Sequence, residues 1–443
     1  MMKKMKVLAV LTALILSSVG CAANNGSGNS GGAGSSGGSD GYVYYINFKP
    51  EADAAWQDLA QKYSAKTGTQ VKIITAASGS YTDTLTAEMN KTMCPTLFVV
   101  NDAQSLANWQ DYCYDLGSTK LVDRLESKDF CMYGASGALN AIGYCYECYG
   151  LIVNKSLLKK SGHDISEIKN FDTLKSVAED IHSHSSELGF DAFTSSGLDD
   201  SSSWRFSGHL STLPLYYEFK ESGITSQPAE ITGKYLNLYK NVWDLYIQNS
   251  ATSPNALNTA TGNMAEEEFG NGKAVFYQNG SWEYSSLTNA DTFAMKPDDL
   301  AMIPIYCGAS GEENAGLCSG TENYWAVNSK ADKKSIDATI DFVDWVVSSD
   351  EGRQMMSDNF GTTPFKDNIP TSNVFLSDAD KLLKDGKFTV TWDFVYTPNS
   401  DAWRAGVVSA LQGYSAGSEG WSAVENAFVN GWSYQYKMEH GTT

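Results

Sequence analysis

Residues 43–74, with the sequence VYYINFKPEADAAWQDLAQKYSAKTGTQVKII, decide the fold of this chain. The apolar run 43–48 predicts a strand, and the residues VKII at 71–74 predict a second one. Between them, Pro50 marks the start of a helix and Gly68 marks its end. Apolar residues recur in this helix at spacings of three and four: Ala52, Ala55, Trp56, Leu59, Ala60 and Tyr63. The order strand, helix, strand is typical of a parallel sheet covered by helices.

The same alternation continues beyond this stretch. Tyr81, Leu85 and Met89 share one face of a predicted helix, and the run TLFVV at 96–100 predicts a third strand. We therefore expect an α/β fold with a doubly wound parallel unit. Ligands of such sheets bind at the carboxyl ends of strands, which is where Asp102 lies. Further helices are expected at residues 171–188, 234–248, 335–348 and 421–436.

The N-terminus has the features of an export signal. Lysines precede an apolar run at 7–16 that is too short to span a membrane, and small residues then lead to Cys21. Residues 24–39 are almost entirely Asn, Gly and Ser, as in a flexible tether. A signal that ends at a cysteine resembles that of a bacterial lipoprotein. We expect a signal peptide at 1–20, lipidation of Cys21 and a tether at 21–41, with the chain anchored on the extracellular face of the cell membrane. An ordinary signal cleaved elsewhere is the alternative.

The charge of the chain excludes some classes of partner. Its formal net charge is −20, and removal of the signal peptide with its three lysines makes the charge −23. Such a charge opposes binding to nucleic acid or to anionic lipid. The chain also has 11 Trp and 24 Tyr, a large supply of flat side chains that can stack on an uncharged ligand.

Seven cysteines remain besides the one at the end of the signal. Cys145 and Cys148 form a C-x-x-C motif, but no second such pair is present to complete a zinc site. The motif does not open a helix as a redox motif would, and we interpret both residues as small apolar side chains of a buried strand. Cys307 and Cys318 flank a Gly-rich turn and are a possible disulfide pair, which the sequence leaves open.

Several motifs of catalytic or cofactor chemistry occur without the structural context that they require. The G-x-G-x-x-G sequence at 32–37 lies in the tether with no strand before it. The G-x-S-x-G sequence at 413–417 follows a predicted helix instead of a strand. The chain has no H-E-x-x-H, EF-hand or P-loop sequence. We expect no cofactor, no metal and no enzymatic activity.

Four segments resemble a known protein family, and they occur in the order that the family has. Residues 147–158 (ECYGLIVNKSLL) resemble its "E-x-x-x-L-I-Y-N-K-x-L-L" strand, and residues 278–283 (QNGSWE) resemble its "N-G-x-W" segment. Residues 350–353 (DEGR) and 396–399 (YTPN), the latter followed by Trp403, resemble two later segments. The chain is identified by this resemblance as a member of the extracellular carbohydrate-binding lipoproteins of ABC importers (solute-binding protein family 1), near the maltose and maltodextrin-binding proteins.

The resemblance implies a type II periplasmic-binding-protein-like fold, in which two α/β lobes joined by a hinge close on a sugar. Mapped by order, the first lobe would contain residues 42–147 and 316–366, and the second would contain 148–315 and 367–443. It also implies an oligosaccharide ligand, with maltooligosaccharides as the leading candidate, and the permease subunits of an ABC transporter as partners. We expect a monomer. Neither the permease nor a sensor that reads the closed state is identified by the sequence.

A sugar ring offers a flat C–H face and a rim of hydroxyls, and therefore requires aromatic rings and planar polar groups. Asp102, Glu147 and Trp282 match the family's binding positions, and the Asn-Gly pair before Trp282 is expected to form a turn that projects the indole from a loop. Others are expected from their places next to polar loops, strand ends or the last cleft segment. The full set of candidate carbohydrate-binding residues is Phe48, Tyr81, Asp102, Glu147, Trp204, Arg205, Trp282, Glu322, Trp392 and Trp403.

Five of these residues also have an ordinary structural interpretation. Asp102 suits a helix N-cap, Glu147 suits a salt bridge across the hinge, and Arg205 suits a surface ion pair. Core packing is the alternative for Trp392 and Trp403.

Two other functions remain open. A glycoside hydrolase would use Asp102 and Glu147 as its carboxylate pair, but neither has an evident apolar pocket to raise its pKa. A binding protein for a polyamine would suit the acidic chain, although Arg205 would then oppose the cation; a peptide is the other non-sugar alternative.

Overall fold

The computed structural model describes residues 41–76, 79–126, 128 and 130–441. The expected signal peptide, the lipidation site Cys21 and the tether up to residue 40 lie outside the described residues. Within the described chain, two separate six-stranded sheets organise the fold, each with its own hydrophobic core. The expected α/β fold class is confirmed.

The first sheet confirms the parallel unit expected from residues 43–100. Its strands, in spatial order, are β2 (Gln70–Thr75), β1 (Tyr42–Asn47), β3 (Leu97–Val100), β11 (Tyr324–Val327), β5 (Leu139–Gly143) and β4 (Cys131–Tyr133). Strand β1 pairs in parallel with both β2 and β3, whereas β11 returns from far along the chain and pairs antiparallel with β3. The carboxyl ends of β1 and β3 therefore lie at the same edge, which places Lys49 and Asp102 near each other.

In the part of the chain that the structure describes, five α-helices pack around this sheet. They are α1 (Asp53–Thr67), α2 (Tyr81–Met89), α3 (Ala103–Trp109), α11 (Lys333–Ser348) and α12 (Asp350–Phe360). A 3₁₀ turn that begins at Pro50 precedes α1, and Gly68 ends it in the left-handed conformation (φ 78°), as expected from the sequence. Trp56 of α1 and Trp325 of β11 are both buried in the core of this lobe, their ring centroids 6.0 Å apart.

The second sheet contains strands from three distant parts of the chain. In spatial order they are β12 (Phe388–Thr391), β10 (Ala315–Gly320), β6 (Glu147–Asn154), β8 (Ala274–Gly280) and β7 (Asp191–Phe193), with β9 (Leu300–Ile303) paired to β6. All eight residues of β6 are buried, including Cys148. The boundary expected at residue 316 falls inside β10, so the chain returns to the first sheet through residues 321–323.

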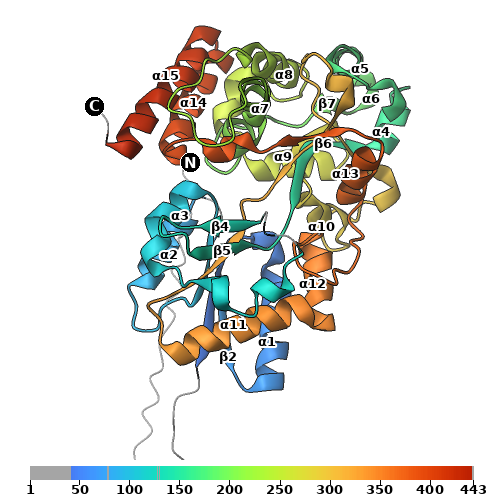
Figure 1. Cartoon of the computed structure of the whole chain (residues 1–443). Coiled ribbons are helices and arrows are strands. Elements are labelled where there is room, and N and C mark those ends of the chain that lie inside the picture. The colour runs from blue at the N-terminus through green and yellow to red at the C-terminus, as the bar shows by residue number, and fades with distance from the viewer. Residues whose placement is uncertain (1–40, 77–78, 127, 129, 442–443) are drawn as a thin grey trace, which may run out of the picture. The chain divides into compact units, whose positions relative to one another are not determined.

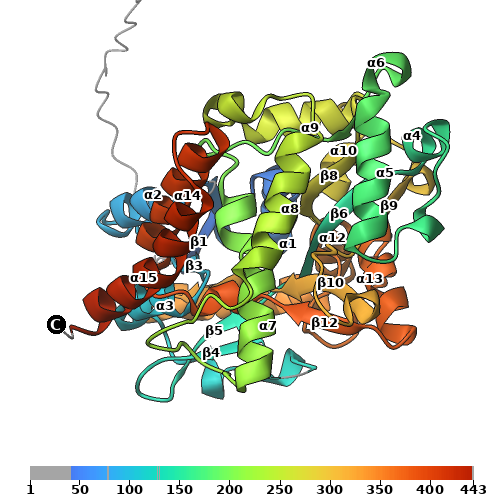
Figure 2. The same ribbon diagram turned by 90° about the horizontal axis from the view of Figure 1, so that it is seen from above.

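Ten α-helices of the described chain belong to the second lobe. They are α4 (Lys155–Lys160), α5 (Phe171–Ser183), α6 (Ser185–Leu188), α7 (Thr212–Ser222), α8 (Leu236–Gln248), α9 (Gly262–Gly270), α10 (Glu283–Thr288), α13 (Val374–Lys384), α14 (Ser400–Ser415) and α15 (Trp421–His440). The four helices expected beyond residue 170 are confirmed, the first of them as α5 and α6 with a break at His184. Helices α14 and α15 lie side by side in both views (Figures 1 and 2).

Backbone hydrogen bonds join the segments that cross between the sheets. The N–H of Tyr144, just after β5, donates to the carbonyl of Asn323 (3.0 Å). The N–H of Tyr146, just before β6, donates to the carbonyl of Thr362 (2.8 Å). Three crossings therefore run together, which is the arrangement of a hinge between two lobes.

The four cysteines that the sequence singles out are buried. Cys145 and Cys148 are buried thiols, and burial raises the pKa of Cys148 to about 12, in agreement with their interpretation as apolar side chains. Cys307 and Cys318 are also buried and form no disulfide.

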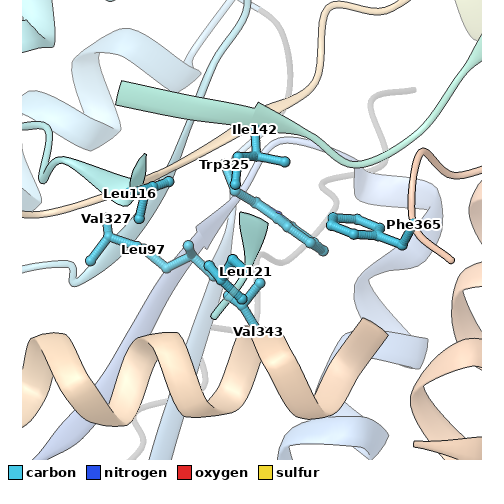
Figure 3. Close-up of a pocket in the computed structure, with 8 residues that line it drawn as sticks. All are labelled: Leu97, Leu116, Leu121, Ile142, Trp325, Val327, Val343 and Phe365. Atoms are coloured by element: carbon cyan, nitrogen blue, oxygen red, sulfur yellow. The ribbon is translucent and has the colours of Figure 1, made fainter. Parts of the chain in front are cut away.

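A cavity of about 10 Å³ lies in the first core. Figure 3 shows Trp325 and Phe365 among the residues that line it. Its apolar lining and small volume identify it as a packing defect. Among the described residues, no helix has the length and apolar character needed to cross a bilayer.

Candidate functional site

Six ring side chains of the second lobe gather where its strands and turns face the crossing segments. We call this group the aromatic cluster; it consists of Tyr149, Trp204, His209, Trp282, Trp392 and Phe394. The ring centroids of Trp204 and Trp282 are 5.7 Å apart, and the two ring planes are inclined at 49°. Both indoles remain partly exposed.

Trp282 is held in place by the glycine before it. Asn279 and Gly280 are the last residues of β8. The prediction that they form a turn is therefore wrong. The indole of Trp282 instead folds back over Gly280, because a Cβ at that position would lie only 2.2 Å from its ring atoms. The Asn-Gly-x-Trp spacing thus fixes the position of the indole through a close contact with backbone.

Trp204 stands at the start of a π-helical segment, Arg205–Leu210, which carries two further residues of interest. Its Nε1 donates to the carbonyl of Ser201 (2.9 Å), and its ring lies edge-on to that of His209, with centroids 5.4 Å apart. Segments of π-helix are rare and occur frequently at functional sites.

Arg205 is buried inside the lobe and does not face a ligand. Its side chain is 1% exposed, and its guanidinium donates to the carbonyl of Ser195 (3.0 Å), the carbonyl of Gln278 (3.3 Å) and the hydroxyl of Ser202 (2.5 Å). The expectation that Arg205 binds sugar hydroxyls is therefore corrected: the side chain lies in the core, where Nη1 and Nη2 donate to the protein and Nε has no partner among the described residues.

Three other candidates are also buried. Trp403 is 2% exposed and donates to the carbonyl of Phe428 (2.9 Å) in the packing between α14 and α15. Tyr81 is 5% exposed, and its hydroxyl accepts from the N–H of Val99 (2.7 Å). Trp392 is 3% exposed and packs inside the cluster, against His209 and Gly320. The structure corrects all three from ligand contacts to packing residues; Phe48 stays partly exposed with its ring edge against Tyr81.

Glu147 takes part in a buried salt bridge. Its Oε1 accepts from Lys49 Nζ (2.7 Å) and its Oε2 accepts from Asn323 Nδ2 (2.7 Å), and the residue is 5% exposed. Both oxygens are thus occupied by donors of the protein, which favours the salt-bridge interpretation over a direct contact with ligand. The salt bridge joins the end of β1 to the start of β6, across the hinge.

Lys49 connects the first lobe with the aromatic cluster. Its ammonium lies 5.1 Å from the centroid of the Trp282 ring, within the range of a cation–π interaction. Burial lowers the pKa of Lys49, but the carboxylates of Glu147 and Glu51 outweigh this and hold it above its usual value. Lys49 therefore stays charged against the edge of the binding surface.

Asp102 is both a helix cap and a contact between the lobes. Its Oδ1 accepts from the N–H of Ser105 (2.7 Å) at the start of α3, as expected for an N-cap. Its Oδ2 accepts from the hydroxyl of Ser400 (3.1 Å) at the start of α14. The second oxygen faces the other lobe, where a ligand hydroxyl could compete with Ser400.

Glu322 lies on the crossing between β10 and β11 and faces His209 and Arg404 of the second lobe. Its carboxyl oxygens are 3.5 Å from His209 Nε2 and 3.7 Å from Arg404 Nη2. Burial raises the pKa of Glu322 to about 7, with Asp102 and Glu147 adding to the increase and Arg404 and Lys49 opposing it. The carboxyl is therefore present in both protonation states near neutral pH.

Glu283, next to Trp282, has a similar environment. Burial raises its pKa to about 8, and the nearby carboxylates of Glu266 and Glu51 add to the increase. It accepts a hydrogen bond from Asn279 Nδ2 (2.8 Å) and keeps partial exposure. A neutral carboxyl beside an indole can both donate to and accept from an uncharged polar ligand.

Several residues of this site were not expected from the sequence, among them Lys49, His209, Asn323 and Arg404. Lys49 follows the carboxyl end of β1, so the rule for ligands of parallel sheets applies to it as it does to Asp102. The other three carry no local signal, because they meet the site only through pairing of distant segments. Among the described residues, no group of three His, Cys, Asp or Glu side chains is arranged to hold a metal ion.

Comparison with known proteins supports the fold. RafE from Streptococcus pneumoniae in complex with raffinose is 15% identical; the match covers 89% of this chain and 99% of RafE, with a TM-score of 0.69. A sugar transporter protein of Bacillus licheniformis in complex with stachyose is 17% identical; the match covers 89% of this chain and 100% of that one, with a TM-score of 0.64. The GacH receptor of Streptomyces glaucescens, solved unliganded and with acarbose, is 18% identical; the match covers 90% of this chain and 98% of that one, with a TM-score of 0.64. They have the same fold as this chain.

A search of curated proteins gave no match. The model of the family described as bacterial extracellular solute-binding protein matches residues 58–385, most of the chain. The chain therefore belongs to the bacterial extracellular solute-binding proteins.

Proposed function

We propose that this protein is the lipid-anchored, monomeric solute-binding component of an ABC importer, and that it captures a neutral oligosaccharide between its lobes. The observation that carries this proposal is the pair of partly exposed indoles, Trp204 and Trp282, with centroids 5.7 Å apart. The ligand passes unchanged to the permease subunits. Maltooligosaccharides remain the leading candidate, through the sequence resemblance alone.

The groups around the indoles fit the rim of a sugar. Glu283 and Glu322 accept or donate according to their protonation, and Asp102 Oδ2 accepts from a hydroxyl already, that of Ser400. Two stacking contacts of about 0.5–1.5 kcal/mol beyond burial, with several hydroxyl hydrogen bonds, support a binding free energy of about −8 kcal/mol. This value corresponds to micromolar affinity, which permits release to a transporter.

The solved relatives support the class of ligand and leave its identity open. They were solved in complex with raffinose, stachyose and acarbose, three oligosaccharides that differ from one another. A shared fold with different ligands is what we expect when the site residues, and not the fold, determine specificity.

The contacts of the two carboxylates argue against a glycoside hydrolase. Glu147 is bound at both oxygens by Lys49 and Asn323, and Asp102 caps α3. A hydrolase needs one carboxyl that is free to protonate the leaving oxygen. A polyamine is disfavoured because Lys49 and Arg404 bring two positive charges to the same site.

Calorimetric titration tests the proposal. The purified chain from residue 22 is titrated with maltotriose, maltopentaose, raffinose and stachyose, and with spermidine and a tripeptide as controls. We expect saturable one-site binding of at least one oligosaccharide and no cleavage products after prolonged incubation. Saturable binding of spermidine or the tripeptide alone, or the release of shorter sugars, would contradict the proposal.

The lipid anchor is tested by Cys21→Ser in the full chain, expressed in a bacterium that processes lipoproteins. We expect the unaltered protein in the membrane fraction with a labelled fatty acid attached, because the acyl chains of a processed lipoprotein insert into the bilayer. We expect the variant to lack the label and to leave the membrane fraction. Cys94→Ser is the matched control and should behave as the unaltered protein. A membrane-bound, labelled Cys21→Ser variant would rule out this site.

A further inference from the structure

His209 occupies an unusual place in the aromatic cluster. Its imidazole stacks on Tyr149, with centroids 4.9 Å apart and ring planes at 16°. The rings of Trp204, Trp282, Trp392 and Phe394 surround it at 4.6–5.4 Å. The side chain is 3% exposed, and its Nδ1 has no hydrogen-bond partner among the described residues. A phenyl ring would fill such a box without a polar group to desolvate, so packing alone does not account for an imidazole here.

The second ring nitrogen faces the crossing between the lobes. His209 Nε2 is 3.5 Å from a carboxyl oxygen of Glu322, whose other oxygen is 3.7 Å from Arg404. The backbone carbonyl of Glu322 accepts from Asn101 Nδ2 (2.7 Å), next to Asp102 of the first lobe. Glu322 is thus tied to the first lobe through its backbone and to the second lobe through its side chain.

We propose that His209 and Glu322 form a positioning pair that links the two exposed indoles to the crossing between the lobes and sets ligand affinity through one shared proton. His209 touches both Trp204 and Trp282, so a shift of its ring shifts the surface on which a sugar would stack. Because Glu322 faces the imidazole, the same shift also moves the crossing segment that carries Glu322. The proposal rests on the proposed function only where it concerns ligand affinity.

The surrounding charges determine where the proton resides. Burial lowers the pKa of His209 well below its usual value, and Arg404 and Lys49 lower it further, so the imidazole stays neutral. Burial raises the pKa of Glu322 to about 7, with Arg404, Asp102, Lys49 and Glu147 as its charged neighbours. Above that pH, we expect the imidazole proton to stay on Nε2, which faces a carboxylate oxygen 3.5 Å away. Below it, the carboxyl gains one proton and donates to Nε2, and the imidazole proton moves to Nδ1, so the pair takes up a single proton.

The ligand-free protein tests the pair directly by nitrogen NMR of ¹⁵N-labelled histidines, with His209→Phe used to assign the signal. We expect Nε2 of His209 to change from the protonated to the unprotonated type as pH falls through about 7, while the ring stays neutral. Glu322→Gln should abolish the change, and His440→Asn, at an exposed site, should leave it intact. A doubly protonated His209 at pH 6, or no change between pH 6 and 8, would overturn the pair.

The effect on affinity is measured with the oligosaccharide that binds best in the titrations. Ligand hydroxyls donate more strongly to a carboxylate than to a neutral carboxyl, so binding favours the ionised form. Affinity should therefore rise with pH through about 7, up to about tenfold for each unit by which the ligand lowers the pKa of Glu322.

Glu322→Gln should remove the change in affinity near pH 7, because it removes the titrating carboxyl. His209→Phe keeps that carboxyl but removes the Nε2 that faces it, so it should move the midpoint of the change, whereas a purely structural role of His209 would lower affinity equally at every pH. A change near pH 7 that persists in Glu322→Gln, or an unmoved midpoint in His209→Phe, would contradict the link to affinity. If no oligosaccharide binds, the proposed function fails while the NMR result still decides the pair.

Discussion

Replacement of Trp282 by alanine is expected to weaken oligosaccharide binding at least about tenfold, or about 1.4 kcal/mol, without unfolding the protein. The indole is partly exposed and contacts Trp204, His209 and Lys49, so its loss removes a stacking face and the ring beneath the Lys49 ammonium. Stacking contributes about 0.5–1.5 kcal/mol beyond burial, and the lost apolar area adds to it. Calorimetric titration measures the change, with thermal unfolding as the check on folding.

Trp345 provides the matched control for this prediction. It is also partly exposed and lies under a lysine, with Lys66 Nζ 5.7 Å from its ring, but it belongs to α11 of the first lobe. Trp345→Ala should leave affinity unchanged, and Trp282→Phe should give an intermediate loss. Equal affinity of Trp282→Ala and the unaltered protein would refute the stacking role of Trp282.

Arg205→Ala is expected to destabilise the second lobe by about 3–5 kcal/mol, a loss typical of a buried polar network. The guanidinium binds two backbone carbonyls and one hydroxyl in a fully buried position. Truncation leaves these acceptors without donors and creates a cavity. Thermal unfolding should show the melting temperature of the second lobe lowered by about 10 °C, at 2–4 °C per kcal/mol for a domain of this size.

Arg404→Ala serves as the control because Arg404 is partly exposed and pairs with a single carboxylate, that of Glu322, at the long distance of 3.7 Å. Its removal should change the melting temperature by little, about 2 °C or less. The sequence-based interpretation of Arg205 as a sugar ligand makes the opposite prediction. An Arg205→Ala variant with unchanged melting temperature and lost affinity would restore that interpretation.

The architecture could be predicted from the sequence because the residues that start and end its helices and strands act locally. Pro50 and Gly68 bound the first helix region, and the continuous apolar run before Asp102 is a strand in the structure. The return of β10 and β11 through residues 321–323 was placed some residues too early. That crossing depends on pairing with β6 and β3, more than 170 residues away, and the local sequence does not report this pairing.

The site could be predicted from the sequence only in part, for a related reason. Pattern and resemblance bring Trp204 and Trp282 to one surface, where the structure also places them. They do not give the direction of a side chain, and Arg205, one residue after Trp204, points into the core. His209 and Arg404 reach the site through a π-helical segment and the packing of α14, neither of which has a sequence signal of its own.

A crystal structure of the complex with the best-binding oligosaccharide tests the central claim most directly. We predict a sugar ring stacked on Trp282 or Trp204, with its hydroxyls hydrogen-bonded to Glu322, Glu283 or Asp102 and its glycosidic bonds intact. A sugar bound away from the aromatic cluster, or a complex with both indoles uncovered, would contradict the claim.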